Sequence, residues 1–239
     1  MEITNTNSPN FGYPKGTRGR AGHKIEAIVQ HVSGGEWGSN RNWITNPSAN
    51  ASYNYYVKKD GEIVCFVPPE NAAYANGRIN RATWSRLKSG VNPNLYTASV
   101  CREGHNHHKP TTAQYHGLLN INYKLIKDNS LAIDRLTLIG HSEIDSVNRW
   151  YCPGSGFPWD EFIRDLRDMD KGEEKPEAEP PDGVPLPEIQ RRIRVEVGDV
   201  VEDRTGYLIN GITYVPALLV STLTGAKVTG HGDHIKIRR

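Results

Sequence analysis

The sequence predicts a mixed α/β fold in which helices flank a central β-sheet, followed by a small second α/β module. Strand-like and helix-like segments alternate along residues 24–169, and a charged, proline-rich stretch then interrupts the pattern at residues 170–190. A new set of short strands begins at residue 191. We therefore expect an N-terminal arm (1–23), a main domain, a linker and a C-terminal module (191–239).

The first half of the main domain is expected to be built from strands. Residues 1–23 are rich in Asn, Gly and Pro and predict an irregular arm, after which residues 25–31 form an apolar run typical of a buried strand. Residues 33–40 are rich in Gly, Ser and Asn and predict a loop. Asp60-Gly61 lies between two aromatic and β-branched runs, at 52–57 and 62–67, which is a strong signal for a β-hairpin.

The second half alternates strands with helices. Residues 96–103 and 133–139 predict strands, and residues 159–169 predict a helix with apolar side chains on one face. Thr111 is a typical N-cap for a further helix, whose apolar positions recur at helical spacing: Leu118, Leu119, Ile121, Leu125 and Ile126.

The C-terminal module has a pattern of its own. Residues 192–197 and 234–237 predict strands, and residues 206–215 predict a hairpin with its turn at Asn210-Gly211. A short helix is expected around Leu218, Leu219 and Leu223.

Composition excludes several classes of partner. A formal net charge of +2 gives no basis for binding nucleic acid. No stretch approaches the roughly 20 apolar residues of a membrane span, so we expect no membrane insertion. The N-terminus lacks the apolar core of a signal peptide, which predicts a protein that is first held in a cytoplasm or that leaves it by another route. Three cysteines form no disulfide framework and are expected to stay reduced.

Three residues form a candidate metal site. His31 ends the apolar run at 25–31, His141 ends another at 138–141, and Cys152 follows eleven positions later in a Cys-Pro-Gly turn. Two histidines and one cysteine are zinc ligands, and three protein ligands leave the fourth tetrahedral position open for water. The set therefore predicts a catalytic Zn²⁺ site; the alternative is two core histidines and an inert buried thiol.

Several segments in this order resemble the zinc-dependent N-acetylmuramoyl-L-alanine amidases of the phage-lysozyme and peptidoglycan-recognition superfamily. The resemblance covers residues 24–165. It is carried by Ile28-Val29-Gln30-His31, by the tyrosine-bearing hairpin at 53–61, by Leu138-Ile139-Gly140-His141-Ser142-Glu143, and by Cys152-Pro153-Gly154 with Phe157-Pro158-Trp159 after it.

The resemblance implies a peptidoglycan hydrolase that cuts the amide between N-acetylmuramic acid and L-alanine of the stem peptide. Polymeric cell wall would be its partner, and the oligomeric state is left open. Zinc suits this reaction because it lowers the pKa of a bound water to about 7 and polarises the carbonyl.

The residues expected to assist zinc depart from the usual pattern. Many relatives carry a glutamate where this chain has Cys101, and the catalytic group is expected to be either Tyr53 or Glu103. Residues two apart share one face of a strand, so Glu103 should point to the side of Cys101. Relatives often carry a lysine at the position of Trp150, and Arg149 could supply that positive charge instead.

Four further residues are expected to contact the substrate: Trp37, Asn40 and Trp43 in the first long loop, and Asn76. Aromatic faces can stack on sugar rings, and loop packing is the alternative for the first three. A cluster at His105, His107 and His108 has no carboxylate or cysteine at ligand spacing, so we interpret it as a solvated loop rather than a metal site.

The segment 191–239 resembles the small module found at the N-terminus of copper amine oxidases and in bacterial surface proteins. On a flexible linker it would attach the enzyme to the wall, or it could stabilise or dimerise the chain. We expect a phage-type endolysin that lyses a Gram-positive host, made in the host cytoplasm and acting after the membrane is permeabilised. The alternatives are a cytoplasmic wall-recycling amidase and a recognition protein that binds without cutting.

Overall fold

The computed structural model describes residues 1–77 and 79–172 in full, and beyond them the backbones of five strands between residues 190 and 238. The chain forms two compact units, Met1–Lys175 and Pro176–Arg239, which are described separately below. Residues 173–189, which make up most of the predicted linker, lie outside the described residues. The exact domain boundaries stay a prediction.

The first unit is built on a six-stranded mixed sheet in the order β1-β4-β3-β5-β2-β6. Three of the central pairs, β2–β5, β2–β6 and β3–β5, are parallel, and β3–β4 is antiparallel. The strands are β1 (Ile3–Asn5), β2 (Ala27–Val32), β3 (Tyr55–Val57), β4 (Ile63–Cys65), β5 (Thr97–Arg102) and β6 (Leu138–Gly140).

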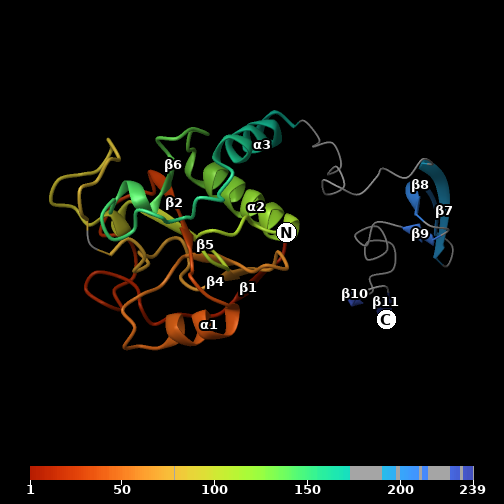
Figure 1. Ribbon diagram of the computed structural model, residues 1–239. Coiled ribbons are helices and arrows are strands. Elements are labelled where there is room, and N and C mark those ends of the chain that lie inside the picture. The colour runs from red at the N-terminus through yellow and green to blue at the C-terminus, as the bar shows by residue number, and fades with distance from the viewer. Residues whose placement is uncertain are drawn as a thin grey trace. The chain divides into compact units, whose positions relative to one another are not determined.

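Helices cover both faces of this sheet, which confirms the predicted fold class. The helices α2 (Thr112–Asn129) and α3 (Trp159–Lys171) lie side by side (Figure 1), and their apolar side chains share one core with Tyr55 and Val57 of β3. Successive strand residues point to opposite faces. Tyr56 accordingly packs on the other side, with Ile44 of α1 (Trp37–Thr45).

Local signals correctly predicted the hairpin and two helices. Tyr55 pairs with Cys65 and Val57 with Ile63, so the chain reverses at the expected Asp-Gly turn. The hydroxyl of Thr111 accepts the backbone N–H of Gln114 at 3.1 Å, which caps α2 as expected.

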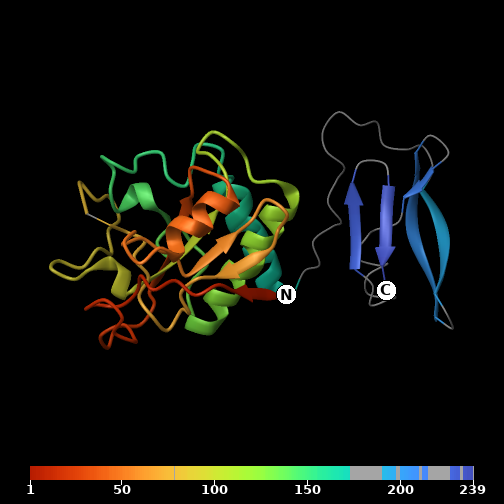
Figure 2. The same ribbon diagram turned by 90° about the horizontal axis from the view of Figure 1, so that it is seen from below.

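Two predictions for the first forty residues were wrong. The arm contains a strand, β1, which pairs in parallel with β4 and lies at the edge of the sheet, dark red in Figure 2. The segment taken for a loop contains the start of α1, although Glu36 at its N-cap makes no side-chain capping bond. A distant carboxylate, that of Glu103, accepts the N–H of Trp37 instead.

The strand predicted at 133–139 is also shorter than expected. Only Leu138–Gly140 joins the sheet, as β6. The carboxylate of Asp134 accepts the backbone N–H groups of Leu136 and Thr137 at 2.8 and 3.0 Å, which folds the preceding residues into a turn. Leu136 is exposed as a result.

The second unit contains two small antiparallel sheets. In one, β7 (Gln190–Val197) pairs with β8 (Val200–Ile209), which pairs with β9 (Ile212–Tyr214). In the other, β10 (Lys227–His231) pairs with β11 (His234–Arg238). The strands predicted at 192–197 and 234–237 are therefore confirmed, and so is the hairpin, because Ile209 of β8 lies opposite Ile212 of β9. The turn residues 210 and 211 themselves and the helix predicted around Leu218 lie outside the described residues.

Among the residues that the structure describes, no helix combines the length and the apolar character that crossing a membrane requires.

Candidate metal centre and active site

The three predicted ligands come together at the carboxyl ends of neighbouring strands. His31 lies near the end of β2, opposite Cys101 of β5, and His141 follows β6 directly, as the first residue of the 3-10 helix η2 (His141–Glu143). Cys152 is brought back by a turn in which its N–H donates to the carbonyl of Arg149 at 2.9 Å and its own carbonyl accepts the N–H of Ser142 at 3.0 Å. Because β2 and β6 are parallel neighbours, their ends place both histidines on one edge.

The donor atoms converge inside the protein. The ligand atoms of His31, His141 and Cys152 all lie within 4.8 Å of one another, and no other such group is found among the described residues. Cys152 Sγ is 3.9 Å from His31 Nδ1, and the two imidazole centroids are 4.6 Å apart. All three side chains are buried.

The side chains of the candidate ligands make few hydrogen bonds to the surrounding protein. His141 Nε2 donates to the carbonyl of Asn76 at 3.2 Å, and the N–H of Val32 donates to Cys152 Sγ at 3.4 Å. Nε2 of His31 is buried without a hydrogen-bond partner of standard geometry. Buried polar atoms without a partner are rare in folded proteins and call for an explanation.

Burial sets the protonation of the three groups. It lowers the pKa of His141 to about 4, with Arg149 acting in the same direction. Burial, then the neighbouring His141 and Arg149, hold the pKa of His31 well below its usual value. Burial raises the pKa of Cys152 to about 11, opposed by the Val32 N–H and by the charges of Arg149 and Arg102. At neutral pH the centre therefore contains two neutral imidazoles and one thiol.

This donor set fits a zinc ion. Two neutral imidazoles and a sulfur on one small, buried site match the ligand types that zinc takes with three protein ligands. Positive charge from Arg149 and Arg102 favours the thiolate that a metal requires.

Tyr53 lies beside the centre, as predicted. Its ring centroid is 5.1 Å from that of His31, and its hydroxyl interacts with Cys101. Burial, then the nearby Cys101 and Cys152, raise the pKa of Tyr53 well above its usual value. The phenol is therefore protonated at neutral pH and acts as a hydrogen-bond donor.

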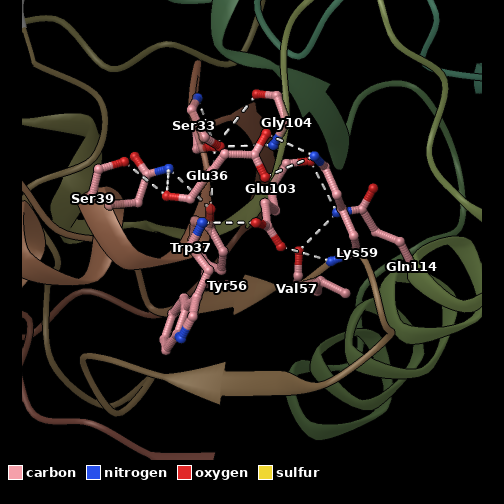
Figure 3. Close-up of polar contacts among 12 residues, drawn as sticks. Ser33, Glu36, Trp37, Ser39, Tyr56, Val57, Lys59, Glu103, Gly104 and Gln114 are labelled. Carbon is pink, nitrogen blue, oxygen red and sulfur yellow. Dashed lines mark hydrogen bonds and ion pairs between the residues drawn. The ribbon is translucent and has the colours of Figure 1, made fainter. Parts of the chain in front are cut away.

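Glu103 is occupied elsewhere. Its two carboxylate oxygens accept the backbone N–H groups of Trp37 at 2.7 Å and Lys59 at 2.9 Å, and the Gln114 side chain donates to its carbonyl at 3.0 Å (Figure 3). Trp37 packs against the cluster that contains Cys101, so the carboxylate of Glu103 lies on the predicted side of the sheet, but both of its oxygens are already bonded to backbone N–H groups. Within the described part of the chain, no hydrogen bond joins Glu103 to the three ligands.

Arg149 acts on the centre through its charge, whereas Trp150 faces solvent. The charge of Arg149 acts on all three ligands, which places the guanidinium near them as the sequence suggested. Trp150 is 70% exposed and packs edge-on against Tyr151.

Of the four residues predicted to contact the substrate, one is exposed, two pack within the protein and one is fully buried. Trp43 is 56% exposed on α1 and is free to meet a ligand. Trp37 packs against Tyr56 and Phe66 at centroid distances of 5.5 and 5.9 Å, and Asn40 donates to the Tyr56 hydroxyl. Asn76 is 0% exposed, so the structure contradicts a direct contact with a polymeric substrate.

Arg102 is a residue that sequence reasoning missed. It is buried, and its Nη2 donates to the carbonyls of His105, His108 and Pro153, which ties the histidine loop to the turn of Cys152. The available signal was a charged residue at the end of the otherwise uncharged segment 97–102. The rings of the histidine loop lie 4.1 to 6.0 Å apart by their centroids.

The fold and the centre together define an α/β protein with a buried His-His-Cys site beside a protonated tyrosine. Residues 21–155 match the family model of N-acetylmuramoyl-L-alanine amidases, more than half of the chain, and the protein belongs to this family. The predicted membership of the N-acetylmuramoyl-L-alanine amidases is thereby confirmed, and the chain is a peptidoglycan amidase by family.

Individual relatives are distant. N-acetylmuramoyl-L-alanine amidase A of Achromobacter lyticus is 25% identical over 158 residues, which cover 59% of this chain and 83% of that protein. A selenomethionine derivative of AmpD has a TM-score of 0.55 at 22% identity, over 70% of this chain and 94% of its own. AmiD of Escherichia coli, solved with anhydro-N-acetylmuramic acid-L-Ala-D-γ-Glu-L-Lys, has a TM-score of 0.51 at 17% identity, over 63% of this chain and 59% of its own. The two structures share the fold.

Proposed function

We propose that this protein is a zinc-dependent N-acetylmuramoyl-L-alanine amidase that cuts the bond between the lactyl group of muramic acid and L-alanine. The observation that carries the proposal is the convergence of three buried donor atoms within 4.8 Å. The family supports the choice of bond, and the substrate bound to AmiD contains the same muramoyl–alanine linkage.

His31, His141 and Cys152 would hold the zinc ion. When bound, zinc supplies an activated water and a Lewis acid for the scissile carbonyl. Burial of the ligands excludes bulk water and strengthens electrostatic interactions within the site.

Tyr53 and Arg149 would assist the reaction. The protonated Tyr53 hydroxyl can donate a hydrogen bond to the reacting amide, and the charge of Arg149 can stabilise negative charge that develops on the carbonyl oxygen. The role of Glu103 is to hold α1 and the hairpin turn in place, because both of its oxygens are already bonded to backbone N–H groups. We therefore favour Tyr53 over Glu103 as the group that takes part in proton transfer.

Substrate would be bound in part by α1. Trp43 is exposed there and offers an aromatic face to a sugar ring, while Trp37 and Asn40 support the helix from beneath.

The biological setting we propose is a phage-type endolysin that acts on a Gram-positive wall after the membrane has been permeabilised. The second compact unit supports a modular enzyme, with the C-terminal module attaching it to the wall. A cytoplasmic wall-recycling amidase would gain little from such a module. A recognition protein that does not cut has no need of the third ligand, which is present here as Cys152.

The decisive experiment is digestion of purified peptidoglycan by the wild type, Cys152→Ala and Glu103→Gln. Mass spectrometry should find stem peptides with free N-terminal alanine for the wild type and Glu103→Gln, and none for Cys152→Ala. New reducing sugar ends without such peptides would refute the amidase assignment.

The role of the module is tested by comparing the full chain with a version ending at Lys175. Sedimentation with purified walls should retain the full chain and lose most of the shorter one. Equal retention would remove the attachment role from the module.

A further inference from the structure

Asn76 contacts the candidate metal centre from within the protein. It is fully buried, and its backbone carbonyl accepts a hydrogen bond from His141 Nε2 at 3.2 Å. A carbonyl can only accept, so Nε2 carries the proton and the lone pair is on Nδ1. His141 therefore presents Nδ1 to the centre.

The side chain of the same residue faces the other histidine. The Asn76 amide acts on His31 as a hydrogen-bonding group, and Oδ1 of Asn76 and Nε2 of His31 are both buried with no other partner in the described structure. Nδ1 of His31 is already directed at Cys152 Sγ, 3.9 Å away. The ring nitrogen left to meet Oδ1 is Nε2, so His31 also presents Nδ1 to the centre.

Neighbouring residues fix how Asn76 is turned. Its N–H donates to Asn94 Oδ1 at 2.9 Å, and its Nδ2 donates to Thr97 Oγ1 at 2.7 Å. The Thr97 hydroxyl donates its only proton to the carbonyl of Pro93 at 2.8 Å, so towards Asn76 it can only accept a hydrogen bond. With the amide nitrogen committed to Thr97, the amide oxygen is the atom that points at His31.

We propose that Asn76 is a positioning residue that sets the tautomer and ring orientation of both histidine ligands, through its backbone carbonyl for His141 and its side-chain oxygen for His31. Metal-bound histidines usually donate their second ring N–H to such a partner, and loss of one partner typically costs 10- to 100-fold in metal affinity. The inference rests on the proposed zinc site, and it replaces the substrate contact expected for this residue.

The test compares Asn76→Ala with Asn122→Ala in the full chain. Asn122 is also fully buried, and its amide bonds to Gln30 at 2.6 Å and to the Leu118 carbonyl at 2.9 Å. Both variants lose a buried amide, but only one loses a partner of a ligand. Zinc affinity, measured by competition with a chromophoric chelator, should fall 10- to 100-fold in Asn76→Ala and stay within about twofold in Asn122→Ala. Equal affinities in the two variants would overturn the inference.

Two further measurements keep the test decisive. Asn76→Asp retains an acceptor oxygen, and its zinc affinity should stay much closer to that of the wild type than that of Asn76→Ala. NMR of the imidazole nitrogens in zinc-free protein should find the proton on Nε2 of both histidines in the wild type, and a tautomer mixture at His31 alone in Asn76→Ala.

The NMR result also separates this inference from the proposed function. A wild type that binds no zinc would remove the zinc site, whereas a His31 tautomer that ignores the Asn76 side chain would remove the positioning role.

Discussion

Two buried polar clusters lie at the carboxyl ends of adjacent parallel strands, and they are built on opposite rules. Around Glu103, after β5, each carboxylate oxygen receives a backbone N–H, from Trp37 and Lys59. Around His31, at the end of β2, the ligand atoms of His31, His141 and Cys152 face one another within 4.8 Å. A satisfied cluster organises the fold, because every polar atom in it is already used. A cluster whose lone pairs converge is arranged to bind a cation.

The largest expected effect comes from breaking the convergent cluster. Cys152→Ala removes one of three ligands, and we expect activity on peptidoglycan to fall by about 10³-fold or more, with zinc affinity falling in parallel. The matched control is Cys65→Ala, another buried cysteine in the first unit but outside the donor group. Retained activity in Cys152→Ala would remove the metal from the mechanism.

Tyr53→Phe should have the next largest effect. It removes a protonated hydroxyl beside His31 while keeping the packed ring, and kcat should fall by roughly 10²-fold, the size typical of a lost proton donor. Tyr56→Phe is the control, because that hydroxyl bonds to Ser33 and Asn40 instead. Equal losses in the two variants would argue against a catalytic role for Tyr53.

Glu103→Gln should separate stability from chemistry. The amide nitrogen cannot accept an N–H, so one of the two backbone bonds is lost and the free energy of unfolding should drop by about 1–3 kcal/mol. Activity of the folded protein should stay within about fivefold of the wild type. Glu36→Gln serves as the comparison, since it weakens only an exposed ion pair with Lys59, for which less than about 1 kcal/mol is expected. A collapse of kcat with unchanged unfolding would reverse the assignment.

The smallest expected effect is the release of one proton when zinc binds. The pKa of Cys152 is raised to about 11 and that of His141 is lowered to about 4, so near pH 7 only the thiol must lose a proton when zinc binds. Zinc affinity should therefore fall about tenfold for each pH unit between pH 8 and pH 6. Calorimetry in buffers of different ionisation enthalpy should find one proton released. A zinc affinity that does not change between pH 6 and pH 8 would show that Cys152 is already a thiolate in the zinc-free protein.

Features that depend on local sequence signals could be predicted, whereas features that depend on long-range contacts could not. The two histidines of the donor group end apolar strands, and a strand end is visible in hydrophobic patterning, so His31 and His141 could be identified as candidate ligands. The hairpin and the start of α2 depend on local signals at Asp60-Gly61 and Thr111.

What could not be predicted depends on long-range contacts. The helix α1 is capped by Glu103, 66 positions away, and Gly/Ser/Asn-rich sequence alone indicates a loop there. The strand at 133–139 was overestimated because Asp134 takes the N–H groups that a strand would need. Asn76 meets His141 through a backbone carbonyl, which any residue possesses and no sequence pattern marks.

The spacing of the ligands has one more consequence. His31 and Cys152 are 121 positions apart, and a cation held by both would close that stretch of chain as a removable crosslink. In a chain-entropy description, linking residues about 100 apart is worth about 4.7 kcal/mol against the unfolded state, before any geometric strain. A metal ion bound at this site would thus crosslink the first and last thirds of the amidase domain. Its removal would inactivate the enzyme and would also lower its free energy of unfolding and its resistance to proteolysis.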